Sequence, residues 1–497
     1  MISAYYQEKW QQVKASANPC DCRDLAEEVA LAFLDRHYFN DAFESDCVRL
    51  LCEMSTAFPS AELNRIGASA LFGIVVESLC DNFEELQTAA YNHLMSYIID
   101  YCAKQEGGET LKAGMARFKI HGFDDLFRRV ERLRKTSSNY RDLPADPKVI
   151  IVLSRVTIGA DVAVTSVLIQ RLCRTFTQAQ IVVIGGGKMN ALYCGHPRVR
   201  FQNVDYSRQG GLLERLQSWF RVLEAVDQAS SGLAPEEVLL ADPDSRLSQL
   251  GVLPLCNDQS YLFFSSRSSQ VFAPQLSISE MVNGWYNQVT GESDNCYPAV
   301  WLDRALQQQA KTRVDRLRER GANQVIAVNL GVGGNTRKRV DDQFEQDMLL
   351  ELLKHPGTVV LLDKGFGEEE VRRTNALLHA AAADGYRVAD TCFEELGQVS
   401  ADAVLIGVEA GIDQVAALIG QSDEFVGYDS ACQHIAAAQE VPTYTIFAGS
   451  NNIRFVRRWC PYGLGRREII HVDTLTQPPI YNRKTILLRL MHARNKS

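Results

Sequence analysis

Up to about residue 137, apolar residues recur along the chain at helical spacing. The segments LAEEVALAFLDRH and FEELQTAAYNHLMSYIIDY show this spacing, and no stretch of this region alternates as a strand would. Pro19 after an asparagine, Ser60 as an N-cap and the glycine pair at 107 and 108 mark the ends of helices. The pattern predicts an all-α domain over residues 1–145.

After the polar, proline-containing stretch 137–148, short apolar runs alternate with helical patterns. The first series is VIIVL, IVVIG, EVLLA and YLFF, and the second is VIAVNL, VVLLD, AVLIGV, EFVGY and TYTIFAG. Continuous apolar runs separated by helices are typical of parallel strands covered on both faces. We therefore expect two doubly wound, Rossmann-like α/β domains, over 146–315 and 316–475.

Two further helices complete this prediction. A charged helical stretch at 303–320 lies between the α/β domains, and residues 476–497 end in a helix with a basic terminus. We expect this last helix to pack back on the body, across the interface between the α/β domains. The carboxyl ends of both sheets should border a cleft, which is where ligands bind in open α/β folds.

Composition and charge narrow the class of protein. With 46% hydrophobic and 23% charged residues the chain resembles an ordinary globular protein, and its net charge of −9 disfavours a nucleic-acid partner. We find no apolar run of about 20 residues, so we expect no membrane span and a cytoplasmic protein. The thirteen cysteines are scattered, as reduced core thiols are, and Cys20 and Cys22 lack the further ligands that a metal site needs.

Asp161 is the first candidate for chemistry. It follows the first apolar run and a glycine turn, at the start of a helix and at the mouth of the predicted sheet. A carboxylate there can act as a helix cap, accepting backbone N–H bonds. It can also act as a general base that removes the proton of an attacking hydroxyl. The residues alone leave both interpretations open.

A glycine-rich, basic segment follows the first strand of the second α/β domain. Its relevant residues are Gly331, Gly333, Gly334, Arg337, Lys338 and Arg339. The spacing matches neither a Walker loop nor the dinucleotide fingerprint. Glycines allow backbone N–H groups to approach an anion, and the cations can stabilise charge on a departing diphosphate. A solvated basic turn is the alternative.

A third candidate lies in EFVGYDSACQHIAAAQEVPTYTIFAG. Asp429 and Ser430 follow an apolar run and begin a helix that carries His434 in its first turns. A helix N-terminus that points into the cleft favours phosphate, and a nearby carboxylate can bind ribose hydroxyls. Alternatively, Asp429 or Ser430 caps the helix and His434 is a satisfied, half-buried histidine.

This segment resembles the Asp-Ser/Thr-Gly-x-x-His-x-Ala-Ala signature of glycosyltransferase family 9, the lipopolysaccharide heptosyltransferases. LIGVEAGIDQVAALIGQSDEFVGYDS and IVLSRVTIGADVAVTSVLIQRLCRTFTQAQIVVIGG are similar to further segments of that family, in the same order, and the resemblance spans roughly residues 148–472. It implies a GT-B fold for this part of the chain, which the predicted helical domain precedes. It also implies metal-free, inverting sugar transfer from a nucleoside-diphosphate sugar, with ADP-heptose as the expected donor and no cofactor.

The resemblance assigns roles to the candidate residues. Asp161 matches the family's catalytic base and Lys338 its phosphate-contacting lysine, while Asp429, Ser430 and His434 fall on its donor-binding motif. The block LLADPDSRLSQLG corresponds to the acceptor side, which makes Asp244 and Arg246 candidates for acceptor contacts. The acceptor itself, a glycan, a lipid-linked glycan or a protein, is left open.

The chain departs from the family pattern at Gly159, which stands one place early, and at Ala431 and Val340, where the family has glycine and tryptophan. These departures bear on the donor's identity. The helical domain lies outside the pattern, so we expect it to recognise an acceptor or another subunit, including a second copy of this chain.

Three alternatives remain at this stage. Asp242 and Asp244 form an Asp-x-Asp that can hold a divalent cation in other glycosyltransferases. The chain can also be a catalytically inactive binding or scaffold protein, or a sugar-nucleotide epimerase of similar shape.

Overall fold

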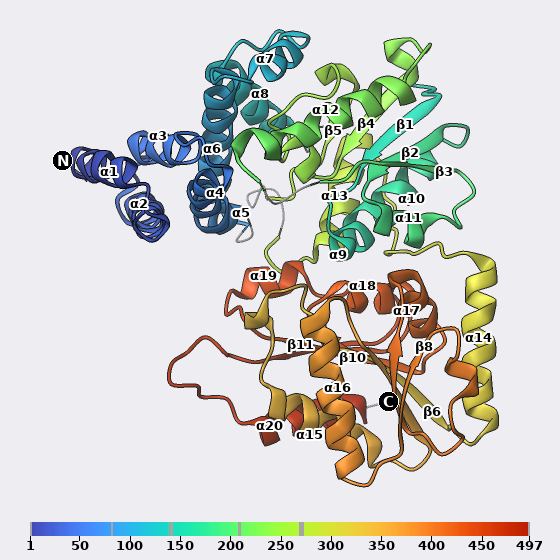
Figure 1. The fold of residues 1–497 in the computed structure, drawn as a ribbon. Coiled ribbons are helices and arrows are strands. Elements are labelled where there is room, and N and C mark those ends of the chain that lie inside the picture. The colour runs from blue at the N-terminus through green and yellow to red at the C-terminus, as the bar shows by residue number, and fades with distance from the viewer. Residues whose placement is uncertain are drawn as a thin grey trace.

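The computed structural model describes residues 2–80, 83–137, 139, 143–206, 210–267 and 273–495. Its parts are a helical domain, a first α/β domain and a second α/β domain (Figure 1). The two α/β domains face one another, as in the predicted GT-B arrangement, and the helical domain lies beside the first.

The predicted helical region consists of helices and contains no strand among its described residues. They are α1 (Ile2–Ser16), α2 (Pro19–Asn40), α3 (Ser45–Met54), α4 (Ala61–Ala70), a π-helical turn (Leu71–Val76), α5 (Glu77–Cys80), α6 (Glu85–Ala103), α7 (Glu109–Ala116) and α8 (Phe123–Thr136). Ser60 caps α4 as predicted, since its side chain accepts from the backbone N–H of Leu63, and the side chain of Asn18 caps α2 in the same manner.

One continuous helix in this domain, Ala61–Cys80, is long and apolar enough to cross a membrane by length and composition alone. From the sequence we expected no segment of this length and apolarity. Half of its most apolar window is buried inside the domain, where Leu71, Val75 and Leu79 join the hydrophobic core. The helix therefore buries one face in the domain core and exposes the other.

The first α/β domain contains a parallel five-stranded sheet in the order β3-β2-β1-β4-β5. Its elements are β1 (Val149–Leu153), α9 (Ile158–Ala160), a π-helical turn (Asp161–Thr165), α10 (Ser166–Thr175), β2 (Gln180–Gly185), α11 (Gly187–Tyr193), β3 (Val199–Asn203), α12 (Leu212–Ala229), β4 (Val238–Asp242), β5 (Tyr261–Phe263) and α13 (Ile278–Thr290). Short 3₁₀ turns cover Pro235–Glu237, Arg246–Ser248 and Asp258–Ser260.

The second α/β domain contains a parallel seven-stranded sheet in the order β12-β11-β10-β6-β7-β9-β8. After α14 (Arg304–Glu319) it comprises β6 (Gln324–Asn329), α15 (Asp342–Leu353), β7 (Thr358–Asp363), α16 (Glu368–Ala383), β8 (Val388–Cys392), β9 (Leu405–Glu409), α17 (Ile412–Ile419), β10 (Glu424–Tyr428), α18 (Ala431–Ala438), β11 (Thr443–Phe447), α19 (Ile453–Arg458), β12 (Arg467–His471) and α20 (Arg483–Arg494). Thr336–Lys338 and Leu396–Gln398 are 3₁₀ turns.

The C-terminal helix α20 does not cross the interface between the α/β domains, so that prediction is wrong. Its apolar side chains Ile486 and Leu490 join the core of the second α/β domain, and Arg494 Nε donates to Glu424 Oε2 at 2.7 Å. The helix lies beside α15, on the side of its own domain away from α9 (Figure 1). Amphipathic burial against the nearest sheet accounts for this position.

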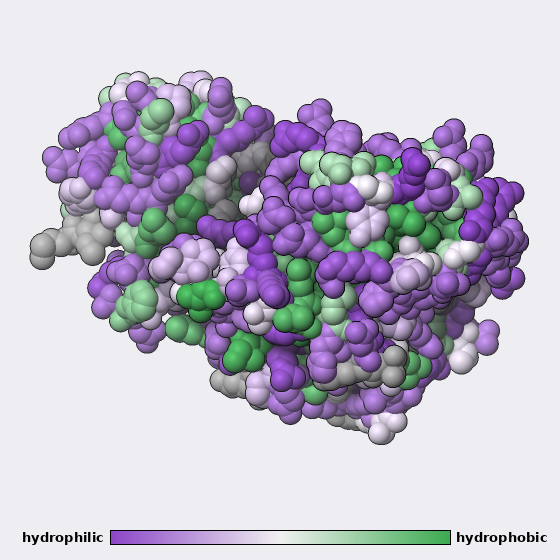
Figure 2. Space-filling model, turned by 90° about the horizontal axis from the view of Figure 1, so that it is seen from below, coloured by the Kyte–Doolittle hydropathy of each residue, from purple (hydrophilic) through white to green (hydrophobic). Residues whose placement is uncertain are grey.

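Seen from the side of the second α/β domain, the molecule carries hydrophobic residues scattered among hydrophilic ones (Figure 2).

The Cys20 and Cys22 thiols do not share one environment, because Cys20 is exposed and Cys22 is buried. Burial raises the pKa of Cys22, which disfavours the thiolate that a metal would need.

Candidate functional site

The carboxyl ends of the two parallel sheets face each other where α9 approaches α18. A Cβ built on Gly159 would lie 3.2 Å from His434 Cδ2 and 3.3 Å from Ala431 Cα. Glycine at 159 is therefore what allows this close approach between the α/β domains, and the two segments that carry Asp161 and the 429–434 motif are already in contact.

Asp161 is a buried carboxylate, 1% exposed, whose side chain is held by its own domain. Its Oδ2 accepts from Ser154 Oγ at 2.7 Å, and its Oδ1 accepts from the Arg155 backbone N–H at 2.6 Å and from Thr165 Oγ1 at 2.7 Å. None of these donors is a free N–H of the helix start, and the N-cap of α9 is Thr157. The helix-cap interpretation of Asp161 is therefore wrong.

The environment of Asp161 raises its pKa to about 6, because burial disfavours the charged form more than the three hydrogen bonds favour it. At neutral pH the group is mostly ionised, yet far more basic than an exposed aspartate. These are the properties that a general base requires, and at 1% exposure the carboxylate is closed to ligands in this arrangement.

Lys338 and Asp429 form an ion pair at the carboxyl end of the second sheet. The Nζ of Lys338 donates to Asp429 Oδ2 at 2.6 Å, and Gln433 Nε2 donates to Asp429 Oδ1 at 2.7 Å. The lysine side chain is 26% exposed, whereas the aspartate side chain is only 7% exposed. The structure thus brings together two candidate residues that lie far apart in the sequence.

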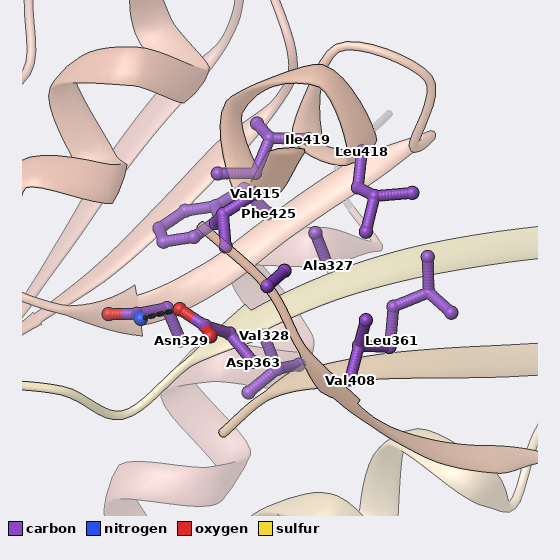
Figure 3. Close-up of a pocket in the computed structure, with 11 residues that line it drawn as sticks. Ala327, Val328, Asn329, Leu361, Asp363, Val408, Val415, Leu418, Ile419 and Phe425 are labelled. Carbon is purple, nitrogen blue, oxygen red and sulfur yellow. Dashed lines mark hydrogen bonds between the residues drawn. The ribbon is translucent and has the colours of Figure 1, made fainter. Parts of the chain in front are cut away.

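Ser430 occupies the N-cap position of α18, but its side chain makes no capping bond. Instead its Oγ donates to Asn329 Oδ1 at 3.2 Å, and Asn329 Nδ2 donates to Asp363 Oδ2 at 2.6 Å (Figure 3). Burial raises the pKa of Asp363, and a cavity of about 20 Å³ adjoins the pair. The first N–H groups of α18 are consequently left without a side-chain cap, as an anion-binding helix end requires.

His434 is not the half-buried histidine that the sequence suggested, because it is only 3% exposed and packs between the two α/β domains. Burial, assisted by the charge of Lys338, lowers its pKa to about 4, so the ring is neutral at pH 7. Its ring lies 6.2 Å from that of Trp459, and Nδ1 has no hydrogen-bond partner among the described residues. Its contacts are those of an interface residue.

The remaining candidates of the glycine-rich segment divide into two kinds. Gly333 and Gly334 form an exposed turn with φ of 61° and 83°, and no atom lies within 4 Å of a Cβ at either position. Arg339, by contrast, donates from Nε and Nη2 to the buried Glu345 at 2.7 and 2.8 Å. Its guanidinium fixes the end of the segment to its own domain, which leaves Lys338 as the segment's cation at Asp429.

The Asp-x-Asp pair is occupied by protein donors. Asp244 accepts from Ser266 Oγ at 2.6 Å and from Arg267 Nε at 3.1 Å, while Asp242 accepts from the Ser245 backbone N–H at 2.7 Å and from the Tyr261 hydroxyl. Burial raises the pKa of Asp242 to about 6. The described residues contain no group of three or more His, Cys, Asp or Glu that could hold a metal ion.

Arg246, the second acceptor candidate, begins the 3₁₀ turn that follows this pair. Its Nη2 lies 4.0 Å from Glu77 Oε2 of the helical domain. The two acceptor candidates therefore have different surroundings. The Asp244 carboxylate is hydrogen-bonded within the core, whereas Arg246 lies where the first α/β domain meets the helical domain.

Several residues of this site were not singled out from the sequence, chiefly Ser154, Thr165, Asn329 and Asp363. Asn329 and Asp363 could have been predicted from the sequence, since each is the polar residue that ends a predicted strand. Polar residues at the carboxyl ends of adjacent parallel strands lie together, and Asn329 and Asp363 are register partners.

One segment of the second α/β domain matches a known protein family. Residues 372–479 match the family "Glycosyltransferase family 9 (heptosyltransferase)", a range that includes Asp429, Ser430 and His434. No curated protein matches the sequence.

The solved structures that resemble the chain include the family 9 glycosyl transferase of Veillonella parvula, with 13% identity, a TM-score of 0.49, and coverage of 71% of this chain and 92% of that one. E. coli ADP-heptose lps heptosyltransferase II has 14% identity, a TM-score of 0.47, and coverage of 70% and 99%. E. coli heptosyltransferase WaaC with ADP has 11% identity, a TM-score of 0.44, and coverage of 69% and 99%.

Proposed function

We propose that this chain, whose residues 372–479 match glycosyltransferase family 9, is an inverting, metal-independent glycosyltransferase that uses a nucleoside-diphosphate sugar. The observation that carries the proposal is the Lys338–Asp429 ion pair, which lies beside the uncapped start of α18. The same helix contacts Gly159, in the segment of the first α/β domain that leads to Asp161. A cation and free helix N–H groups bind diphosphate, and a basic carboxylate activates a hydroxyl.

In this mechanism the donor diphosphate binds between Lys338 and the N-terminus of α18. The acceptor hydroxyl attacks the anomeric carbon as its proton passes to Asp161, and the bond to the diphosphate breaks with the negative charge leaving toward Lys338. Because cation and dipole are in place before the reaction, they stabilise this charge without reorganisation. Attack opposite to the leaving group inverts the anomeric configuration.

The proposal does not require a metal. Asp242 and Asp244 are bonded to Ser245, Tyr261, Ser266 and Arg267, and a cation there would have to displace these donors. Turnover that survives excess EDTA would support the metal-free mechanism, and turnover restored only by added Mg²⁺ or Mn²⁺ would contradict it.

ADP-heptose is the first donor to test, because the matched family is described as heptosyltransferase. The experiment incubates the full chain with ADP-heptose and candidate glycans, detects ADP release, and determines the anomeric configuration of the product by NMR. We expect Lys338→Ala to lower turnover by at least about tenfold, the usual scale for loss of one charged contact to a transition state. Lys354→Ala, which removes an exposed lysine paired with Glu351, is the matched control and should have wild-type activity.

A second candidate function is binding of a nucleotide sugar without transfer. The burial of Asp161 and the closed contact at Gly159 favour it, since no acceptor reaches the carboxylate in this arrangement. The two functions differ in one measurement: saturable ADP binding with no ADP released from ADP-heptose, in the presence of any acceptor, would favour the binding protein.

A further inference from the structure

Two hollows adjoin each other along the outer face of helix Ala61–Cys80. One, of about 200 Å³, lies between this helix and the first α/β domain, and the other, of about 510 Å³, lies between this helix and α2. Ser69 and Gly73 line both. The hollows therefore meet at these two residues, and together we call them the groove.

The floor of the groove is a stripe of exposed residues at helical i, i+4 spacing: Arg65, Ser69, Gly73 and Glu77. Nothing lies within 4 Å of a Cβ at Gly73, so no protein neighbour accounts for a glycine there. The stripe runs about 18 Å along the helix axis, at about 1.5 Å per residue. That length accommodates about five residues of extended polypeptide.

The two ends of the groove differ in charge. At the α2 end Arg23 and Arg65 alternate with Glu27 and Glu62. At the other end Arg215 and Arg246 face Glu77, with Tyr206 completing the wall. Mixed charges suit a polymer that carries both signs, as a polypeptide does, and paired guanidinium groups suit a carboxylate.

The cationic end is built into the fold. The Arg215 guanidinium lies 4.4 Å from the centre of the Phe72 ring, and its Nε donates to Gly210 O at 3.1 Å. Tyr91, which is fully buried and does not line the groove, interacts electrostatically with Arg246 and Tyr206.

This end of the groove is linked to Asp161. Arg246 directly follows Ser245, whose hydroxyl donates to Ser154 O, and Ser154 Oγ donates to Asp161. The loop that carries Arg246 is therefore hydrogen-bonded to the loop whose Ser154 holds the carboxylate.

We infer that this groove binds an acidic segment of a polypeptide, with a carboxylate side chain seated between Arg215 and Arg246. Resting on the proposed function, the inference makes this polypeptide the acceptor and a hydroxyl residue near its acidic anchor the site of sugar transfer. The helical domain then supplies half of the acceptor site.

Fluorescence anisotropy with the full chain and a labelled (Ser-Glu)₅ peptide tests the inference, with (Ser-Lys)₅ and an oligogalacturonate of similar charge as comparison probes. We expect (Ser-Glu)₅ to bind and both comparison probes to bind at least about tenfold more weakly. Arg215→Gln and Arg246→Gln should each weaken (Ser-Glu)₅ at least about tenfold, the scale of one charged hydrogen bond. Gly73→Leu should abolish binding by filling the floor without changing charge.

The matched control is Arg117→Gln, which removes an exposed arginine of the helical domain paired with Asp227 and should bind like wild type. No binding of (Ser-Glu)₅, equal loss in Arg117→Gln, or preference for the oligogalacturonate would each overturn the inference. ADP binding, measured on every variant, separates the two proposals. Peptide binding without ADP binding would reject only the donor site, and ADP binding without peptide binding would reject only the groove.

Discussion

The raised pKa of Asp161 predicts how turnover depends on pH. A general base must be ionised, and the pKa of Asp161 is about 6, so turnover should fall as pH drops through about 6. Ser154→Ala removes a hydrogen bond to the ionised form, which raises the pKa further and should move the acid limb to higher pH. Asp161→Asn should lower turnover severely with ADP binding nearly unchanged. An acid limb that keeps its position in Ser154→Ala would assign it to another group.

The same pKa affects folding with a definite sign. Because the folded pKa of Asp161 is above the value of 3.8 expected for an unfolded aspartate, the native state binds more protons between pH 3.8 and about 6. The group's contribution to stability is therefore greatest at low pH and is lost as pH rises through about 6. Urea titrations of wild type and Asp161→Asn across this window should show a smaller decline with rising pH in the variant. An equal decline in both proteins would contradict the assignment.

Asp244 should act mainly through stability. It is 1% exposed and is the partner of Arg267, itself 3% exposed, so Asp244→Ala leaves a buried guanidinium without its carboxylate. Such a loss costs about 3–5 kcal/mol. Asp227→Ala, which breaks an exposed pair with Arg117, should cost at most about 1 kcal/mol. Denaturant unfolding of both variants measures the difference, and similar values would mean that Arg267 finds another partner.

At this scale the sequence predicts which residues gather but not how each side chain is bonded. Asp429, Ser430 and Lys338 lie together because strand ends of a parallel sheet share an edge, which a pattern of apolar runs is sufficient to predict. Arg339 points instead to Glu345, and Ser430 to Asn329 rather than to its own helix. Such choices depend on competing partners that become neighbours only in the folded chain.

At the scale of elements, the contact between α9 and α18 is close enough to be disturbed by added side-chain atoms at Gly159. Gly159→Val adds carbon atoms where 3.2 Å separates a Cβ from His434, so the two segments must move apart. We expect a loss of about 1–3 kcal/mol of stability from overpacking and a turnover lowered by up to about a hundredfold from misplacement of Asp161. Gly186→Val, at a glycine of the same domain with nothing within 4 Å, is the matched control and should change neither. Equal effects of the two substitutions would place the closing contact elsewhere.

The strands show where prediction from the pattern succeeds and where it fails. All nine predicted runs are strands, and eight of them lie inside a sheet, where both faces are covered and nearly every residue is apolar. The unpredicted strands β3, β8 and β12 lie at sheet edges. Their sequences VRFQN, VADTC and REIIH are only partly buried, so they lack the continuous apolar run that identified the others.

For the molecule as a whole, the helical domain is joined to both α/β domains. Thr88 Oγ1 of α6 donates to Arg267 O of the first α/β domain at 3.2 Å. Arg454 of α19, in the second α/β domain, donates to Phe83 O at 2.9 Å and pairs with Glu84 at 2.7 Å. A domain attached to both halves opposes their separation, and the proposed mechanism needs such a separation to bring an acceptor to the buried Asp161.

Removing the attachment to the second half should therefore make opening easier. Arg454→Ala breaks a partly exposed ion pair worth at most about 1 kcal/mol, which corresponds to about a fivefold change in an equilibrium constant. We expect release of a fluorescent ADP analogue, measured by stopped flow, to accelerate by up to about fivefold. Arg457→Ala, at an exposed position of the same helix, should leave the rate unchanged. If Arg454→Ala slows release or leaves it unaltered, the helical domain does not restrain opening, and its contribution is confined to the groove along helix Ala61–Cys80.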